Sequence, residues 1–400
     1  MPQGVEVITG LSGIQVKHVE GGEKTLVHAD FVGLRVCRHC SSSKVRLKGH
    51  YFRDLKHTRS GNRLISIRLR VFKLRCQACH RYSMSQVPGV LPRRRATESF
   101  RLEVFEKHQA GHTQLHLSKT HAIGQATVER WYQDFIVYRV KEMSTRPCPR
   151  VLGIDEHFFT KKQGFATTFT DLRNGKVFDV TLGRSEISLS RYLSGLKERH
   201  RVKIVVIDLS ETYRSIIKKY FPNAKIVTDR FHVVRLINYY FQKIWQSLDP
   251  KSKNNRGLLS LMRRHPWHLS EDQKSMLQKY LDSIQGLAPI YESRTQLLKL
   301  MLLKKLSWSE ARQKIHEFLQ ILSHLTDCPL EALKTLGKTL NSWKEEILRM
   351  WRVSWNNGMT EGFHTKMEMI SRRAYGFRNF QNYRLRVIAL CGWDGLIRRW

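Results

Sequence analysis

Three acidic residues stand at positions where the surrounding sequence would hold them in a reactive site. Asp208 ends the apolar run Lys203-Ile-Val-Val-Ile-Asp208, and Asp155 ends the similar run Val151-Leu-Gly-Ile-Asp155. Glu361 follows a Gly-containing loop and opens a predicted helix, which Asn357 or Thr360 is expected to cap. Side chains alternate between the faces of a strand, so an acid at the end of a buried strand is held in a cleft. Grouped carboxylates bind Mg²⁺ or Mn²⁺, and a pair of such ions supports phosphoryl transfer. The pattern predicts metal-dependent chemistry on a phosphodiester.

Other acids compete for these roles. Glu156 follows Asp155 directly and points to the opposite face of an extended chain, which favours an outward-facing surface acid. Asp171 and Asp179 flank a predicted hairpin turn and are expected to lie in solvent. Asp229 also ends a predicted strand and is the rival of Asp208 for the place of second acid.

Polar residues near these acids have less certain roles in the sequence. His232 either contacts the scissile phosphate, orients an acid, or is a satisfied core histidine at a helix start. On the helix that Glu361 opens, Lys366, Arg372 and Arg373 are expected to grip phosphates that flank the cut. The alternative for these three is a solvated helix face.

The charge of the chain points to nucleic acid as its partner. Seventy Lys plus Arg against thirty-four Asp plus Glu give a formal net charge of +36, and such a surface repels itself unless a polyanion neutralises it. Small basic proteins that merely adhere to phosphate are poor in large apolar residues, whereas 41% of these 400 residues are hydrophobic and nine are Trp. This length predicts two to four domains. The sequence has no apolar run of about eighteen residues and no secretory pattern at its start, so a cytoplasmic protein without a membrane partner is expected.

Four of the seven cysteines form two C-x-x-C pairs, Cys37/Cys40 and Cys76/Cys79, which are separated by 35 residues. A two-residue spacer lets both sulfurs face one ion, and two such pairs complete a tetrahedral, structural zinc site. The segment from Lys44 to Arg75 carries eleven Lys or Arg and one acid and is expected to form a hairpin arm. Four unrelated buried cysteines, a redox pair, or ligation by His39 or His80 are the alternatives.

The apolar pattern predicts a multidomain α/β protein. Residues 1–92 are expected to form a β-rich zinc-binding domain of short strands, and residues 93–145 a helix-turn-helix domain. Residues 146–248 and 351–400 are expected to form the two parts of a ribonuclease H-like core. Residues 249–350 between them are expected to form an all-helical insertion. In the core we expect strands at 151–159, 164–171, 176–182, 203–208 and 224–228, and helices at 188–198, at 211–221 and from Phe231 onward. Asn174-Gly175 predicts the turn of a hairpin.

The segment from Gln114 to Tyr132 is typical of a helix, a short turn and a second helix. Thr127 and Arg130 lie early in that second helix, where a helix-turn-helix meets the base edges of the major groove. A small helical packing domain is the alternative. Trp131 and Tyr132 are expected in the core that these two helices form. The helical insertion has four tryptophans that are also expected in a core, namely Trp245, Trp267, Trp308 and Trp343. One of these four would be able to stack on a flipped base.

Several strings of the chain resemble insertion-sequence transposases of the three-acid (DDE) type, and most of all the ISL3 family with its zinc-binding N-terminus. They are Val206-Ile-Asp-Leu-Ser-Glu-Thr-Tyr213, Phe221-Pro-Asn-Ala-Lys-Ile-Val-Thr-Asp-Arg-Phe-His-Val-Val234, Asn356-Asn-Gly-Met-Thr-Glu-Gly362 and Arg372-Arg-Ala-Tyr-Gly-Phe-Arg-Asn-Phe380. The resemblance implies Asp155, Asp208 and Glu361 as the three catalytic acids, with Asp229 and His232 as a secondary motif. It also implies Mg²⁺ or Mn²⁺ at these acids and structural Zn²⁺ at the cysteines. Its partners would be the terminal inverted repeats of the element and a target DNA, bound by a homodimer or larger homo-oligomer.

Two alternatives stand beside an active transposase. One is a zinc and helix-turn-helix DNA-binding protein whose catalytic domain is only a scaffold, although a pure binder has no need of three matched acids. The other is a structure-selective nuclease with the same acids, which would cut DNA without joining a 3′ end to a target.

Overall fold

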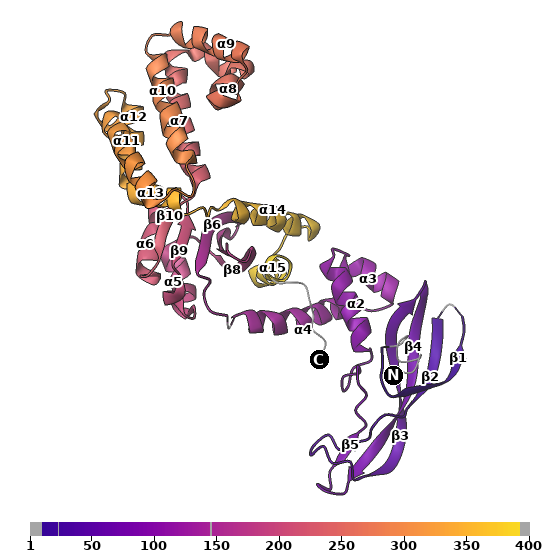
Figure 1. The fold of residues 1–400 in the computed structure, drawn as a ribbon. Coiled ribbons are helices and arrows are strands. Elements are labelled where there is room, and N and C mark those ends of the chain that lie inside the picture. Colours follow the sequence, from indigo (N-terminus) through magenta and orange to yellow (C-terminus); the bar gives the residue numbers. More distant parts are fainter. Residues whose placement is uncertain (1–9, 23, 145, 393–400) are drawn as a thin grey trace. The chain divides into compact units, whose positions relative to one another are not determined.

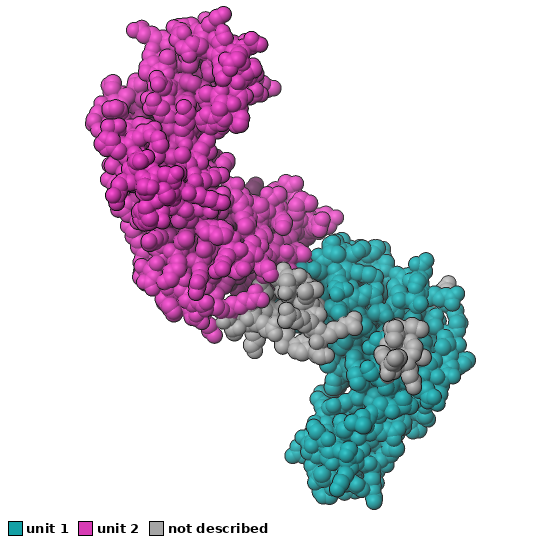
Figure 2. Space-filling view, viewed as in Figure 1, with its two compact units in different colours: residues 1–139 teal, residues 140–400 magenta. Residues whose placement is uncertain are grey.

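The computed structural model describes residues 10–22, 24–144 and 146–392, and the chain divides into one unit of residues 1–139 and another of residues 140–400 (Figures 1 and 2). The ends of the predicted first and last domains, residues 1–9 and 393–400, lie outside the described residues. The chain is a mixed α/β protein, as the sequence predicts. No helix of the described part has the length and apolarity that crossing a membrane requires.

The first unit contains a sheet of β1 (Ile14–Glu20), β2 (Lys24–Phe31), β3 (Val45–Ser60), β4 (Arg63–Cys76) and β5 (Tyr82–Met84). The strand order is β1-β2-β4-β3, with β5 paired to β4. The strands β3 and β4 form the expected hairpin arm, but they span 16 and 14 residues and are not short. The register pairs Val45 with Cys76, so the base of this hairpin brings the two cysteine pairs together.

Three helices follow: α2 (Glu98–Gln109), α3 (Gln114–His121) and α4 (Gln125–Ser144), the last of which continues past the end of this unit at Arg139. The turn between α3 and α4 contains Ala122 in the left-handed region, at φ 51°. Trp131 and Tyr132 are 7% and 1% exposed, which confirms their predicted place in the core. Arg130 donates to Thr127 Oγ1 at 3.1 Å, so the two predicted base-reading side chains contact each other.

The second unit is built on a sheet in the order β10-β9-β6-β7-β8. The strands β6 (Val151–Thr160), β7 (Gly164–Asp171) and β8 (Lys176–Leu182) are antiparallel neighbours, whereas β9 (Ile204–Ile207) and β10 (Lys225–Thr228) run parallel to β6. The helices α5 (Glu186–Gly195) and α6 (Glu211–Tyr220) connect these strands. α5 begins two residues before the predicted start because Ser185 and Ser188 form a capping box.

A helical arm extends from the edge of this sheet (Figure 1). α7 (Arg230–Leu248) leads outward, and α8 (Arg256–Arg263) and α9 (Glu271–Asp282) lie at the far end. α10 (Leu287–Leu302), α11 (Trp308–Asp327), α12 (Glu331–Ser342) and α13 (Lys344–Arg352) bring the chain back. The first half of α7 packs in the core of the sheet through Val233 and Ile237, and its second half packs in the core of the tip through Phe241 and Trp245. α7 therefore contributes side chains to both cores.

The four tryptophans of the arm fall into two classes. Trp245 and Trp343 are 1% and 3% exposed, as predicted for core residues. The prediction is wrong for Trp267 and Trp308, which are 46% and 71% exposed. Trp308 lies under the guanidinium of Arg352, at 3.5 Å from the ring centroid, so its exposed ring is occupied by a cation.

Candidate active site

The register of the sheet brings three carboxylates side by side. β6 pairs with β9 through Gly153 and Val206, so Asp155 and Asp208 each lie two residues further along neighbouring parallel strands. β9 pairs with β10 through Ile207 and Thr228, and the residues that directly follow are Asp208 and Asp229. The predicted first acid, the predicted second acid and its rival therefore form one row across three strands.

The fourth carboxylate comes from α14 (Gly358–Arg373), which carries Glu361 in its first turn. His232, in the first turn of α7, lies between the acids. Its Nε2 is 3.2 Å from Asp208 Oδ2, 3.8 Å from Glu361 Oε1 and 3.9 Å from Asp229 Oδ2. The structure thus brings Asp208, Asp229, Glu361 and His232 together, although 152 residues separate the second acid from the third in sequence.

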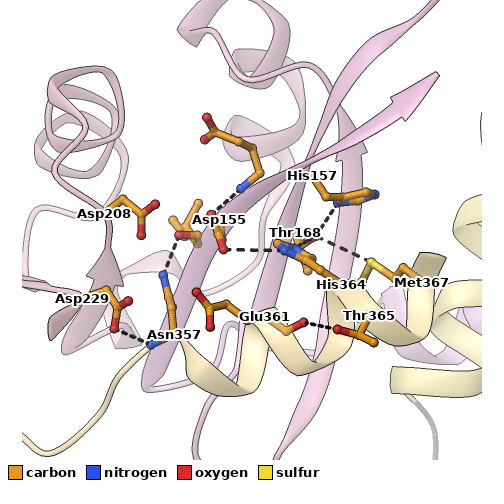
Figure 3. A network of polar contacts seen from close by, with 12 residues as sticks. Asp155, His157, Thr168, Asp208, Asp229, Asn357, Glu361, His364, Thr365 and Met367 are labelled. Carbon is orange, nitrogen blue, oxygen red and sulfur yellow. Dashed lines mark hydrogen bonds and ion pairs between the residues drawn. The ribbon is translucent and has the colours of Figure 1, made fainter. Parts of the chain in front are cut away.

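Burial separates Asp208 from its rival. The side chain of Asp208 is 26% exposed, whereas that of Asp229 is 1% exposed. Asp229 Oδ1 accepts a hydrogen bond from the backbone N–H of Asn357 at 3.1 Å, and the Asn357 side chain donates to the carbonyl of Ile154 at 3.2 Å (Figure 3). Asn357 is the N-cap residue of α14, but its side chain ties the helix to β6 instead of capping it. Asp229 therefore anchors the start of α14, and Asp208 is the acid that a substrate can reach.

Few groups of the described residues balance the negative charge of these acids. Burial, and after it the charge of Asp208, raises the pKa of Asp155 to about 7. Burial, and after it the charge of Asp229, raises the pKa of Asp208 to about 7. Among the described residues, the only basic side chains that pair with Asp155, Asp208 and Asp229 are histidines, and the buried atoms Asp208 Oδ1 and Asp229 Oδ2 have no hydrogen-bond partner. Carboxylate oxygens that lack a balancing charge and a hydrogen-bond partner fit a divalent cation such as Mg²⁺ or Mn²⁺.

We expect Asp155→Asn to stabilise the protein at pH 8 in magnesium-free buffer by about 4 kcal/mol. The pKa of Asp155 is raised from 3.8 to about 7, so the folded state binds the proton more tightly and stability falls as pH rises between these values. The penalty is complete above pH 7 and absent below about pH 4, and the amide removes it. Urea unfolding at pH 8 and pH 4 measures the difference, and equal stabilisation at both pH values would contradict this origin.

A chain of polar contacts that the sequence did not reveal leads to Asp155 (Figure 3). His364, one turn after Glu361 on α14, places Nδ1 at 3.7 Å from Asp155 Oδ2 and Nε2 at 3.1 Å from Thr168 Oγ1. The same hydroxyl lies 3.1 Å from Nδ1 of His157, whose Nε2 is 2.7 Å from the hydroxyl of Tyr383 on α15 (Phe380–Val387). Burial lowers the pKa of His364 to about 4 and that of His157 to about 3, so both rings are neutral at pH 7. The spacing of Glu361 and His364 is the one sequence signal that points to this contact.

Close packing of α14 on β6 depends on Gly153. A Cβ at this position would lie 2.8 Å from Asn357 Oδ1, 3.0 Å from Thr360 Oγ1 and 3.0 Å from Leu172 Cδ2. We expect Gly153→Ala to destabilise the protein by about 2 kcal/mol, because the helix that carries Glu361 has to shift. Gly362→Ala is the matched control, since nothing lies within 4 Å of a Cβ there and alanine favours the helix. Urea unfolding compares the two, and similar midpoints would mean that the packing is not tight.

Two of the competing acids differ from their predicted surroundings. Glu156 is not a fully exposed surface acid, because its side chain is 32% exposed, it pairs with Arg184 at 3.4 Å, and its charge helps to raise the pKa of Asp208. Asp179 is not solvated, because both its oxygens accept from Arg384 at 2.7 Å and its side chain is 13% exposed. α15 covers the edge of the sheet here and supplies that arginine.

The predicted phosphate-binding side chains of α14 lie at its surface. Lys366, Arg372 and Arg373 are exposed, Lys366 Nζ lies 5.4 Å from the ring centroid of Phe363, and Arg372 pairs with Glu368 at 2.6 Å. They share the helix of Glu361 but lie beyond it towards the C-terminal end.

The four predicted zinc ligands form one cluster in the first unit. Their sulfurs lie within 4.8 Å of one another, with 3.6 Å between Cys37 and Cys79 and 3.5 Å between Cys40 and Cys76. A tetrahedral ion with Zn–S bonds of about 2.3 Å separates its sulfurs by about 3.8 Å. Backbone N–H groups of Cys79 and Ala78 lower the pKa of Cys76 to about 6, and that of His39 lowers the pKa of Cys37. The donor set and its spacing therefore fit zinc.

Comparison with known proteins agrees with this geometry. A family model described as a transposase, of the DDE type and the ISL3 group, matches residues 152–387. A transposase for the insertion sequence element IS1001 from Bordetella parapertussis is 25% identical over 248 residues, which cover 60% of this chain and 60% of the relative. A Lactococcus lactis protein named ATP-dependent protease is 22% identical over 180 residues, 42% of this chain and 54% of that protein. The matched regions thus span little more than half of each relative.

Proposed function

The chain belongs to the ISL3 family of insertion-sequence transposases, and we propose that it cleaves DNA at the ends of its element and joins the freed 3′ ends to a target. The row of Asp155, Asp208 and Asp229 across three parallel strands, completed by Glu361, is the observation that carries the proposal. We propose that the five-stranded sheet, with its order β10-β9-β6-β7-β8, is a ribonuclease H-like core.

In this proposal Asp155, Asp208 and Glu361 are the three catalytic acids. Bound Mg²⁺ or Mn²⁺ ions would activate the attacking water or 3′-hydroxyl and stabilise the leaving oxygen. Asp208 and Glu361 present their oxygens to the substrate side, and His232 holds both through its Nε2. Asp229 acts indirectly, because it fixes the backbone of Asn357 and so the position of Glu361. His364 does the same for Asp155.

DNA binding is assigned to separate parts of the chain. Cys37, Cys40, Cys76 and Cys79 would hold a structural Zn²⁺ ion at the base of the β3–β4 arm, whose basic residues face a polyanion. Thr127 and Arg130 would read base edges from the start of α4, as in a helix-turn-helix. Lys366, Arg372 and Arg373 would hold phosphates near the cut. Cutting both ends of an element needs two active sites, so we propose a homodimer or larger homo-oligomer on DNA, acting in the cytoplasm at the nucleoid.

The deciding experiment incubates the full chain with DNA that carries an element end joined to flanking sequence, with Mg²⁺, with Mn²⁺, and without a divalent ion. We expect metal-dependent cleavage at the element end and products in which the 3′ end is joined to a second DNA. Cleavage without joining would favour a structure-selective nuclease. Binding without cleavage would favour a scaffold whose acids are not used.

No structural feature of the described residues favours the activity named for the Lactococcus lactis relative. A nucleotide-binding loop needs G-x-x-x-x-G-K-[ST] between a strand and a helix. Gly337-Lys338-Thr339 is the similar string here, but Ala332 stands in place of the first glycine and the string lies inside α12.

A further inference from the structure

One face of α7 leads outward from the acid cluster. The helix begins next to Asp229 and carries exposed side chains at steps of four residues, so they form one stripe. These residues are Phe231, Arg235, Tyr239 and Lys243, and the two aromatic rings are 55% and 60% exposed. Aromatic and basic side chains thus alternate along the helix. We call this set the α7 stripe.

A basic hollow lies at α8, which follows α7 in the chain and lies at the far end of the arm (Figure 1). The hollow has a volume of about 470 Å³, and its walls are formed by Arg256, Leu259, Ser260, Arg263 and Arg264. We call this the arginine hollow. Residues 256, 260 and 263 recur at helical spacing, so α8 presents them on one side.

An exposed tryptophan follows α8 directly. Trp267 is 46% exposed although its ring stacks on His265, with 4.6 Å between the centroids and 12° between the planes. The imidazole covers one face of the indole, so the exposure falls on the other face and the edge. A ring supported in this way offers a flat surface for a nucleobase.

Hydrogen bonds join the tip to α7. Gln242 accepts from Arg263 at 2.8 Å. Arg294 on α10 is 3% exposed and donates to Asn238 on α7 at 2.9 Å and to the carbonyl of Arg263 at 3.2 Å. The stripe and the hollow are therefore parts of one packed structure.

The charge of this region is one-sided. Residues 230–270 contain eight Lys or Arg and a single acid, Asp249. That acid accepts from the hydroxyl of Tyr280 at 2.6 Å and from the backbone N–H of Lys251 at 3.1 Å. Among the described residues, no carboxylate forms an ion pair with the basic side chains Arg235, Lys243, Arg256 or Arg264. A surface of this kind is complementary to a polyanion.

We propose that the α7 stripe and the arginine hollow form a track for DNA that leaves the acid cluster. The basic side chains take backbone phosphates, and Tyr239 and Trp267 stack on bases that are unpaired. This rests on the proposed function, because it assumes that DNA occupies the cluster. The nineteen residues of α7 rise roughly 28 Å, which corresponds to about 8 base pairs, so the hollow meets phosphates about that far from the cut.

The basic part of the track is tested by the triple variant Arg235→Ala/Lys243→Ala/Arg264→Ala. Each lost phosphate contact lowers the slope of log affinity against log salt by about 0.9, so we expect a slope shallower by about 2.7. The control is Arg312→Ala/Lys338→Ala/Lys344→Ala, which removes the same charge from exposed positions of α11, α12 and α13. Equal slopes for the two triple variants would overturn the track.

The DNA used in that titration identifies which DNA lies on the track. If the triple variant loses affinity only for element-end DNA, the track binds the element. If it loses affinity only for unrelated duplex, the track binds the target. When the duplex is shortened to fewer than about 8 base pairs on either side of the cut, the triple variant and the wild type should have the same slope of log affinity against log salt. Failure of the wild type itself to bind or cut element-end DNA would instead count against the proposed function.

The aromatic part is tested by Tyr239→Ala/Trp267→Ala, with the exposed Trp308→Ala as control. Stacking contributes about 1–3 kcal/mol per base, so we expect affinity for DNA with unpaired nucleotides near this position to fall at least tenfold. Affinity for the fully paired DNA should change less than twofold. An equal loss on paired and unpaired DNA would overturn the assignment of these rings to bases.

Discussion

Asp208→Asn is expected to lower strand cleavage at least a thousandfold and to leave DNA affinity within about twofold of wild type. The amide keeps the shape of the side chain but removes the charge that holds a divalent cation, and losses of this size follow when transition-state charge is left unbalanced. Affinity should survive because the basic surfaces lie elsewhere. Single-turnover cleavage in Mg²⁺, together with a binding titration of the same DNA, measures both quantities.

Asp229→Asn distinguishes the second acid from its rival. The new amide still accepts the backbone N–H of Asn357 through its side-chain oxygen, so we expect a loss of about tenfold, which is indirect and small beside that of Asp208→Asn. Glu156→Gln is the matched control, because this acid lies next to Asp155 and is only partly buried. A larger loss for Asp229→Asn than for Asp208→Asn would exchange the roles of the two residues.

The sheet of the second unit could be predicted closely because its signals are local. Strands β7 and β8 begin and end at the predicted residues, since the Asn174-Gly175 turn sets the position of both strands without distant contacts. The row of acids follows from the same reasoning, because acids at the ends of adjacent parallel strands meet at one edge of the sheet.

The contacts that position the side chains of the site could not be predicted, because they depend on packing between segments that are distant in sequence. His364 reaches Asp155 only because α14 lies against β6, which in turn requires Gly153 to lack a side chain. Asp179 lies in a hairpin that is exposed by its local sequence, and only the packing of α15 buries it. Trp267 is a large aromatic residue of the kind that usually lies in a core, yet the arm is too thin at its tip to cover the ring.

Cys76→Ser is expected to abolish zinc binding by the full chain, from about one ion to less than about 0.2 ion per molecule. Serine is a poor zinc ligand, and Cys76 ends β4 opposite Val45, at the base of the hairpin. Without the ion, the β3–β4 arm should open at its base, and the segments next to the sulfur cluster, residues 37–48 and 73–84, should become sensitive to protease. Metal analysis and limited proteolysis measure these changes.

The sulfur cluster lies outside the apolar core of the first sheet, which Leu55, Ile67, Leu69 and Val71 build from the middle of β3 and β4. Loss of zinc should therefore open the hairpin base while the middle of the sheet stays folded, and it should leave the second unit intact. DNA affinity should fall at least tenfold because the basic arm loses its fixed shape, whereas Cys328→Ser, at a half-buried thiol of the second unit, should bind zinc and DNA as wild type does. Full zinc content in Cys76→Ser would mean that this cysteine is not a ligand, and His80, four residues further on, would be the first replacement to test.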